Sequence, residues 1–259
     1  MDQRVFTRWP ILLGATLGLL IWCVPSTGRA ADSSRFALEI EGGAVWQSRN
    51  DVQIPNNISA TRFSLMELVG HGPWPAARVY VTWNISARHG LRVLAAPLQY
   101  TESGVFADTV RFAGGTFAPG SPTEATYKFN SFRLTYRYRL VSSTRWRWWI
   151  GFTAKLRDAR VALEQGSTAA EDTDLGFVPL LHVSGAYLFS DAWRITLDLD
   201  ALAGGPGRAE DVALKVEYAI SPRWALTAGY RTVEGGADVD AVYNFAWFNY
   251  AVASLIYRF

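Results

Sequence analysis

A histidine and a serine two residues apart, His182 and Ser184, are the residues of this sequence best suited to nucleophilic chemistry. An imidazole can take a proton from a serine hydroxyl, and alternate residues of a β-strand share one face. The neighbours Leu181, Val183 and Tyr187 fall on the opposite, apolar face. The pair therefore faces the polar side of a strand, where we favour hydrogen bonds to carboxylates over a catalytic site.

Charged side chains recur at alternate positions along several segments. In 193–201, for example, Arg194, Asp198 and Asp200 alternate with apolar residues, which predicts a strand with one polar and one apolar face. We assign the polar faces to the interior of a barrel. They either cross-pair into a network that fills a narrow barrel, which we favour, or line a thin aqueous path whose basic excess prefers anions. The predicted interior residues are Glu39, Glu41, Arg78, Arg133, Arg137, Arg139, Lys155, Arg157, Arg194, Asp198, Asp200, Lys215, Glu217 and Arg231.

Acidic residues gather in three segments that we expect to be outer loops. Carboxylate oxygens are the ligands that calcium and magnesium prefer, but none of the three has the spacing of a defined calcium loop. We therefore expect solvated, charged loops, and predict no metal site and no cofactor. The sequence also lacks a glycine-rich phosphate loop, a zinc motif and a nucleophile elbow. The three acidic groups are Glu171, Asp172 and Asp174; Glu210 and Asp211; and Glu234, Asp238 and Asp240.

The carboxyl-terminal segment, 241–259, has a long period-2 pattern without glycine or proline. Leu255, Tyr257 and Phe259 fall on one face, and Arg258 falls on the other. Such a run suits a strand between lipid and a polar interior. The terminal Phe259, with Tyr257 and Leu255 at alternate positions, resembles the closing-strand signal of bacterial outer-membrane β-barrel proteins. The resemblance implies assembly in the outer membrane by the barrel-insertion machinery.

The amino terminus indicates export. Arg4 and Arg8 precede an apolar run, 11–24, that is too short to span a bilayer as a helix. We predict a signal peptide over 1–30 and an outer-membrane β-barrel over 31–259.

Cleavage near Ala30 would leave a mature chain without cysteine, because Cys23 is the only one and lies in the apolar run. A mature disulfide is then excluded. The mature chain also has equal numbers of basic and acidic residues, since the basic excess lies in the export signal. This balance gives no support to nucleic-acid binding.

Four short polar segments that begin with serine, three of which continue into tryptophan, predict the periplasmic turns. Tryptophan at the start of the next strand would lie in an interfacial aromatic belt. Four such turns, with a first and a last strand, give an all-β, antiparallel transmembrane barrel of about ten strands, with eight as the alternative. The longest outer loops are expected near 47–75 and 101–126. The turns are 86–89, 143–146, 190–193 and 221–224, and the strands 35–46, 76–86, 90–100, 127–141, 146–160, 176–189, 193–203, 211–220, 224–233 and 241–259.

Two further resemblances bear on function. A His-x-Ser pair such as His182 and Ser184 on a barrel strand is similar to the lipid A deacylase family, in which the pair works with an acidic partner, although here both residues face the interior. The strand count is that of the omptin outer-membrane proteases, whose site needs acidic residues and a histidine at the outer rim, where only His71 is available.

From these patterns we expect a non-enzymatic outer-membrane protein, either a structural surface barrel or a weakly conducting, anion-leaning, porin-like one. A barrel enzyme acting on lipid A and an omptin-like protease are the alternatives. The expected partners are outer-membrane lipid, lipopolysaccharide and the insertion machinery, with no nucleic acid. The oligomeric state and the cargo stay open.

Overall fold

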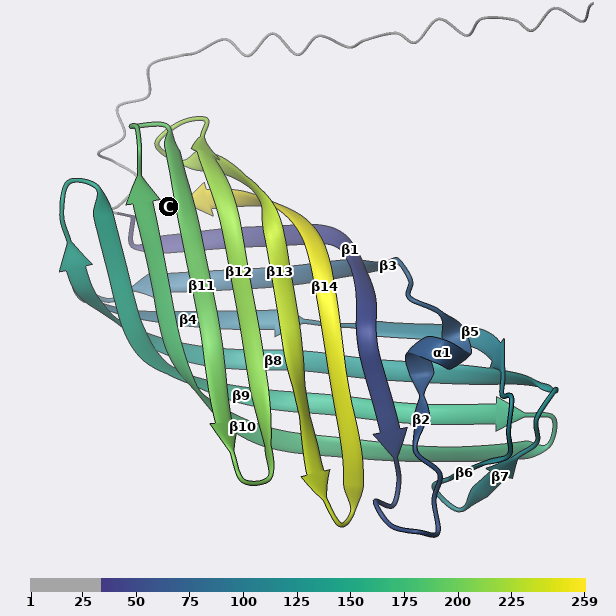
Figure 1. Cartoon of the computed structure of the whole chain (residues 1–259). Helices are drawn as coiled ribbons and strands as arrows, with labels where there is room; N and C mark the ends of the chain where they lie inside the picture. The colour runs from purple at the N-terminus through teal and green to yellow at the C-terminus, as the bar shows by residue number, and fades with distance from the viewer. Residues whose placement is uncertain (1–33) are drawn as a thin grey trace, which may run out of the picture.

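A computed structural model describes residues 34–259 of the chain, which form a closed antiparallel β-barrel (Figure 1). Ten strands make the barrel wall within this range, so the predicted count of ten is confirmed and the eight-stranded alternative is wrong. The predicted signal peptide and cleavage site lie outside the described residues. The wall strands are β1 (Phe36–Gln53), β3 (Trp74–Asn84), β4 (His89–Ala96), β8 (Pro122–Ser142), β9 (Trp146–Gln165), β10 (Thr168–Leu188), β11 (Trp193–Gly204), β12 (Gly207–Ala219), β13 (Trp224–Val239) and β14 (Val242–Arg258).

The last strand closes the barrel. β14 pairs with β13 on one side and with β1 on the other, from Ala37 opposite Arg258 to Gln53 opposite Tyr243. The Phe259 amide donates to the Phe36 carbonyl over 2.9 Å, so pairing continues to the last residue. A closed sheet leaves no strand edge at membrane depth, where an unpaired backbone group has no water to bond.

The predicted serine turns are held by the serine side chains. The hydroxyl oxygens of Ser143, Ser190 and Ser221 each accept a hydrogen bond, 3.0–3.1 Å long, from the backbone amide of the tryptophan three residues later. This side-chain bond stabilises a tight turn locally. Each tryptophan then packs against a tyrosine of a neighbouring strand: Trp146 on Tyr187, Trp193 on Tyr218 and Trp224 on Tyr257.

The outer wall of the barrel is apolar above these aromatic pairs. Large side chains such as Phe152, Leu134 and Leu181 are about half exposed or more on this face. Two outward ion pairs, Lys128–Asp158 and Arg160–Glu171, lie farther along the same strands. We take these ion pairs as the limit of the lipid-facing band on the side of the long outer loops, because charged side chains favour water over hydrocarbon even when they are paired.

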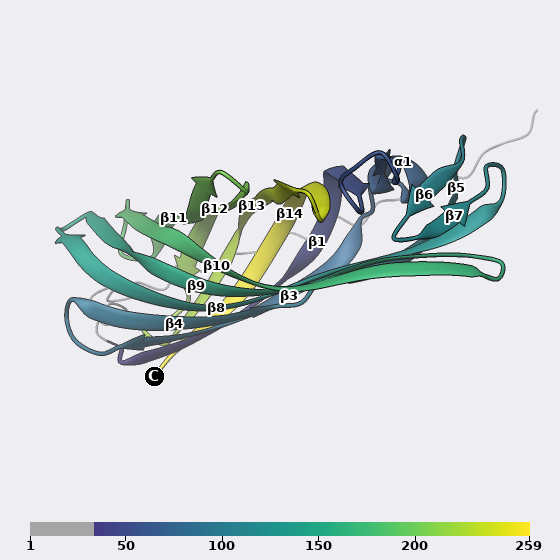
Figure 2. The ribbon, with the colours of Figure 1, turned by 90° about the horizontal axis from the view of Figure 1, so that it is seen from below.

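The two long outer loops contain structure of their own, beyond what the sequence pattern predicted. They include β2 (Phe63–Ser64), α1 (Leu65–Val69), β5 (Gln99–Val105), β6 (Val110–Phe112) and β7 (Gly115–Phe117). Figure 2 shows α1, β5, β6 and β7 gathered over one end of the barrel. The strand predicted over 90–100 is divided, since β4 ends before Pro97, which has no amide hydrogen to donate, and β5 continues along β8.

Stacked aromatic rings fill this end of the barrel. Trp74 stacks on Tyr100 with ring centroids 3.8 Å apart, and Tyr127 lies 5.5 Å from both Tyr100 and Phe248. Burial raises the pKa of the Tyr100 phenol, as expected for a dry environment. We call these rings, with Phe106, Phe112 and Phe117, the outer aromatic core. In the described range no helix is long and apolar enough to span a membrane.

The expectation that the acidic groups occupy loops is wrong for most of them. β10 begins at Thr168 and therefore includes Glu171, Asp172 and Asp174, because β9 and β10 stay paired far beyond the lipid-facing band. Glu210 and Asp211 likewise lie in β12, and Glu234 and Asp238 in β13.

Candidate functional site

His182 and Ser184 lie on β10 and face the barrel interior, as expected, opposite two aspartates of β11. The register pairs His182 with Asp200 and Ser184 with Asp198. His182 Nδ1 is 2.8 Å from an Asp200 carboxylate oxygen, and Nε2 is 3.1 Å from Ser184 Oγ. Because a carboxylate only accepts, Nδ1 carries the proton, and Nε2 of a neutral imidazole then accepts from the serine hydroxyl. The three side chains thus form the hydrogen-bonded series Ser184–His182–Asp200.

Asp200 is held by two further donors. Thr153 Oγ1 donates to one carboxylate oxygen over 2.8 Å, and Arg133 donates to the other over 2.8 Å. Both Asp200 and His182 are only 1 % exposed. A buried carboxylate with this many donors is fixed in position, so the imidazole that it contacts is fixed as well.

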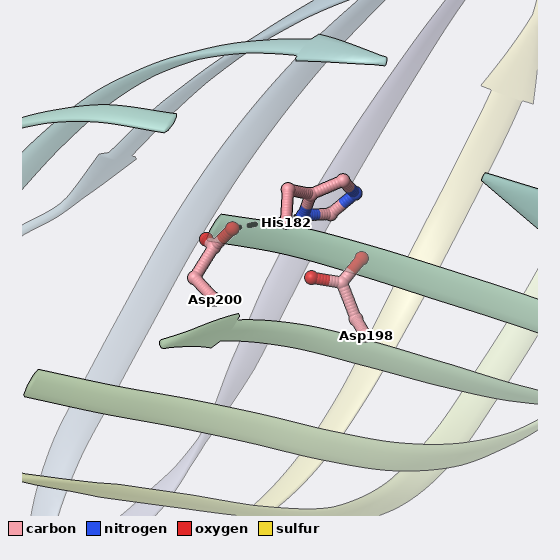
Figure 3. Close-up of side chains that lie close together, drawn as sticks. All are labelled: His182, Asp198 and Asp200. Carbon is pink, nitrogen blue, oxygen red and sulfur yellow. Dashed lines mark hydrogen bonds and ion pairs between the residues drawn. The ribbon is translucent and has the colours of Figure 1, made fainter. Parts of the chain in front are cut away.

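Asp198 brings a second carboxylate toward the same imidazole (Figure 3). One ligand atom each from His182, Asp198 and Asp200 would lie within 4.8 Å of one another, a donor set that a divalent cation accepts. The two carboxylates are already paired, however: Arg92 donates to Asp198 through both terminal guanidinium nitrogens, Nη1 and Nη2, and Arg133 binds Asp200. A cation at this point would meet two guanidinium charges at close range, so the residues present do not fit a metal.

Asp211 of β12 is the centre of the interior charges. Its carboxylate accepts hydrogen bonds from Arg78 over 3.0 Å, Arg133 over 2.7 Å and Arg231 over 2.5 Å. Asp211 is 3 % exposed and lies opposite Asp200 in the register, with Arg133 bridging the two carboxylates. The assignment of Asp211 to an outer loop is therefore wrong. Asp211 lies an even number of residues from Lys215 and Glu217 along β12 and therefore on the same face, and this spacing was the signal that could have placed it inside.

Glu41 of β1 joins the same group. It lies 2.9 Å from Lys215, 3.3 Å from Arg231 and 3.8 Å from Arg78. We call the buried residues Glu41, Arg78, Arg133, Asp200, Asp211, Lys215 and Arg231 the interior network. It joins β1, β3, β8, β11, β12 and β13 across the barrel.

Two basic residues outside the predicted interior set, Arg92 and Arg258, also belong to the interior charges. Arg92 of β4 pairs with Asp198, and Arg258 of β14 lies 2.5 Å from Glu217, which also binds Arg194. Arg258 falls on the polar face of the last strand, so its alternation with Phe259 was a usable signal. Arg92 lies on the short strand β4, in which the alternation of polar and apolar residues is weaker than in β14.

Other predicted interior residues lie outside the interior network. Glu39 pairs with Lys215 over 2.5 Å at its edge. Lys155 lies over the ring of Phe129, 4.7 Å from its centroid, and Arg157 pairs with Asp174 toward the outer end.

Arg137 and Arg139 lie near the short-turn end of β8. Their guanidinium carbons are 5.6 Å and 5.4 Å from the ring centroid of Trp149. Neither is in an ion pair with a carboxylate among the described residues.

A cavity of about 200 Å³ opens among the charges of the short-turn end. Ser184, Asp198, Arg92, Arg137 and Trp149 are among the residues that line it. Beyond the interior network, a second cavity beside Arg78, Arg133 and Tyr250 has only about 10 Å³, which is room for roughly one water molecule.

No protein-family model matches the sequence, and no curated protein matches it. Among solved structures, the outer membrane protease OmpT of Escherichia coli matches 86 % of this chain and 96 % of its own, with a TM-score of 0.53 and 11 % identity. The translocator domain of the autotransporter NalP of Neisseria meningitidis matches 86 % of this chain and 88 % of its own, with a TM-score of 0.41 and 11 % identity. Neisserial surface protein A matches 87 % and 98 %, with a TM-score of 0.38 and 14 % identity. At such identities a likeness shows the fold alone, and the fold of this chain is that of a small bacterial outer-membrane β-barrel protein.

Proposed function

We propose that this protein is a non-enzymatic surface barrel of the outer membrane, with an interior closed to steady ion flow. The observation that carries the proposal is the interior network, whose side chains are less than a tenth exposed and join strands on opposite sides of the barrel. Small barrels are commonly filled by their own side chains. The short turns and both ends of the barrel-forming chain would face the periplasm, and the outer aromatic core would face the cell exterior.

Two layers separate the ends of the barrel. The interior network crosses the barrel at membrane depth, and the outer aromatic core covers the end of the barrel away from the short turns. Between the large cavity and the outer core, the space beside Arg78 and Arg133 holds about one water molecule. An ion would have to separate buried ion pairs to pass, which costs several kcal/mol per uncompensated charge.

Planar-bilayer recording of the purified, folded protein tests this closure. We expect no steady channels, and a preference for anions in any residual current, because basic residues exceed acidic ones around the large cavity. The double variant Tyr127→Ala/Phe248→Ala removes rings from the outer aromatic core only, and we expect it to stay closed because the interior network is intact. Large, steady, cation-selective channels from the unaltered protein would contradict the proposal.

One observation supports a second candidate, a serine hydrolase. In the Ser184–His182–Asp200 series, an acidic group orients a base that contacts a hydroxyl, which is the arrangement of an activated nucleophile. Ser184 also borders the large cavity. Ser184 faces the interior and is 6 % exposed, so a substrate would have to be a small soluble ester that enters from the short-turn end, not a lipid A acyl chain in the bilayer.

The omptin-like alternative has less support. His71 Nδ1 lies 3.1 Å from the backbone carbonyl of Gln47, and no cluster of carboxylates surrounds it among the described residues. The likeness to OmpT extends to the fold, while the residue types that such a site needs are not gathered around His71.

A fluorophosphonate probe separates the two candidates. If the protein is not an enzyme, we expect no covalent adduct on Ser184 by mass spectrometry after prolonged incubation of the folded barrel. Stoichiometric labelling of Ser184 that is lost in His182→Ala, together with hydrolysis of a soluble ester, would replace the leading proposal by the hydrolase.

A further inference from the structure

The cavity at the short-turn end has more positive than negative charge on its walls. Seven basic side chains line it against three carboxylates. We call this cavity the vestibule. Its basic residues are Arg92, Arg137, Arg139, Arg194, Lys215, Arg231 and Arg258, and its carboxylates are Glu39, Asp198 and Glu217.

The ion pairs within the barrel leave part of this charge without a counter-charge. Arg92 is matched by Asp198, and Lys215 by Glu39. Glu217 pairs with the guanidinium groups of both Arg194 and Arg258, and Arg231 pairs with Asp211 and Glu41.

Arg137 and Arg139 have no carboxylate partner in the described part of the chain. Their polar contacts there are modest: Arg137 donates to the side-chain oxygen of Asn84 over 3.3 Å, and both guanidinium groups pack on Trp149. Among the described residues, the Nε–H groups of both have no acceptor, and neither does Nη1 of Arg258. Half-buried guanidinium groups without counter-charge are unfavourable in a low dielectric, so an anion that bound beside them would be stabilised.

We propose that the vestibule binds a small polyvalent oxyanion of the phosphate class, either inorganic phosphate or a soluble phosphate monoester. Guanidinium groups present paired donors that match phosphate oxygens, and phosphate carries enough charge to balance Arg137 and Arg139 together. The residues lining the vestibule include Ser34, just before β1, and Asn84 and Arg258, the last residues of β3 and β14, so the ligand enters along the barrel axis and not from the bilayer. The site does not depend on whether the interior conducts.

Calorimetric titration of the folded full-length protein with inorganic phosphate, in a zwitterionic detergent at low salt, tests the site. We expect saturable binding by the unaltered protein and a loss of roughly tenfold or more in affinity in Arg137→Gln/Arg139→Gln. The matched control is Arg145→Gln/Arg223→Gln, which removes the same charge from exposed turn residues at the same end and should keep its affinity within about twofold.

Several results would overturn the proposal. Absence of phosphate binding by the unaltered protein would do so, as would equal losses in the two double variants, which would indicate a diffuse surface effect. If the Arg137→Gln/Arg139→Gln variant does not fold, Arg139→Gln alone replaces it, because Arg139 makes no side-chain hydrogen bond to the described residues. Binding only to anionic phospholipid vesicles, without competition from inorganic phosphate, would assign the surface to lipid headgroups and refute a soluble ligand.

Discussion

Replacing Asp211 by asparagine is expected to lower the free energy of unfolding of the barrel by about 3–5 kcal/mol, the range for removing one partner of a buried ion pair. Asp211 accepts from Arg78, Arg133 and Arg231, and no other carboxylate within residues 34–259 contacts all three. Asparagine keeps the size of the side chain but removes its charge, which leaves three buried guanidinium groups sharing Glu41 and Asp200.

Urea titration of the folded protein in detergent, followed by tryptophan fluorescence, measures this loss. Asp174→Asn is the matched control, because Asp174 also pairs with an arginine, Arg157, but its side chain is 49 % exposed. An exposed pair contributes roughly 0–1 kcal/mol, so this variant should unfold near the unaltered protein. Equal effects of the two substitutions would show that the interior network does not hold the barrel together.

Replacing Phe259 by aspartate, or deleting it, is expected to leave the chain exported and processed but mostly unassembled. Phe259 is 65 % exposed on the outer wall, and its amide forms the last hydrogen bond of the closing strand with Phe36. An aspartate at the membrane boundary removes the aromatic signal and adds a charge beside lipid. The heat-modifiable, folded form in outer-membrane fractions should fall to a small share of the total.

The chain contains a close control for this effect. Phe189, like Phe259, follows a tyrosine by two residues, contacts that tyrosine ring and is about half exposed at the short-turn end. Phe189→Asp makes the same chemical change without touching the carboxyl terminus, and we expect near-normal assembly. If both variants assembled normally, or both failed alike, the terminal position would have no special role.

The fold was predictable because its signals are local. Period-2 alternation along Trp193–Gly204 and Gly207–Ala219 needs only the geometry of a strand, and the serine turns need only a hydroxyl three residues before an amide. These signals recur often enough to determine the strand count and the order of pairing. Strand lengths were less predictable, because pairing of β9 with β10 continues past the lipid-facing band, where no apolar pattern marks it.

The sequence by itself determined that this chain forms a barrel with a charged interior, because alternate residues of each strand lie on the same face of the sheet. Only the tertiary structure decided which charges meet. The odd or even position of a residue gives the face on which it lies, but not how far two distant strands are shifted along the barrel axis. The contacts of Lys215 with Glu39 and of Arg78 with Asp211 therefore depend on the stagger set by closing the barrel. His182 and Asp200, by contrast, meet through the local register of the β10–β11 hairpin. The stagger between distant strands leaves Arg137 and Arg139 without a carboxylate, which is why the vestibule became visible only in the folded molecule.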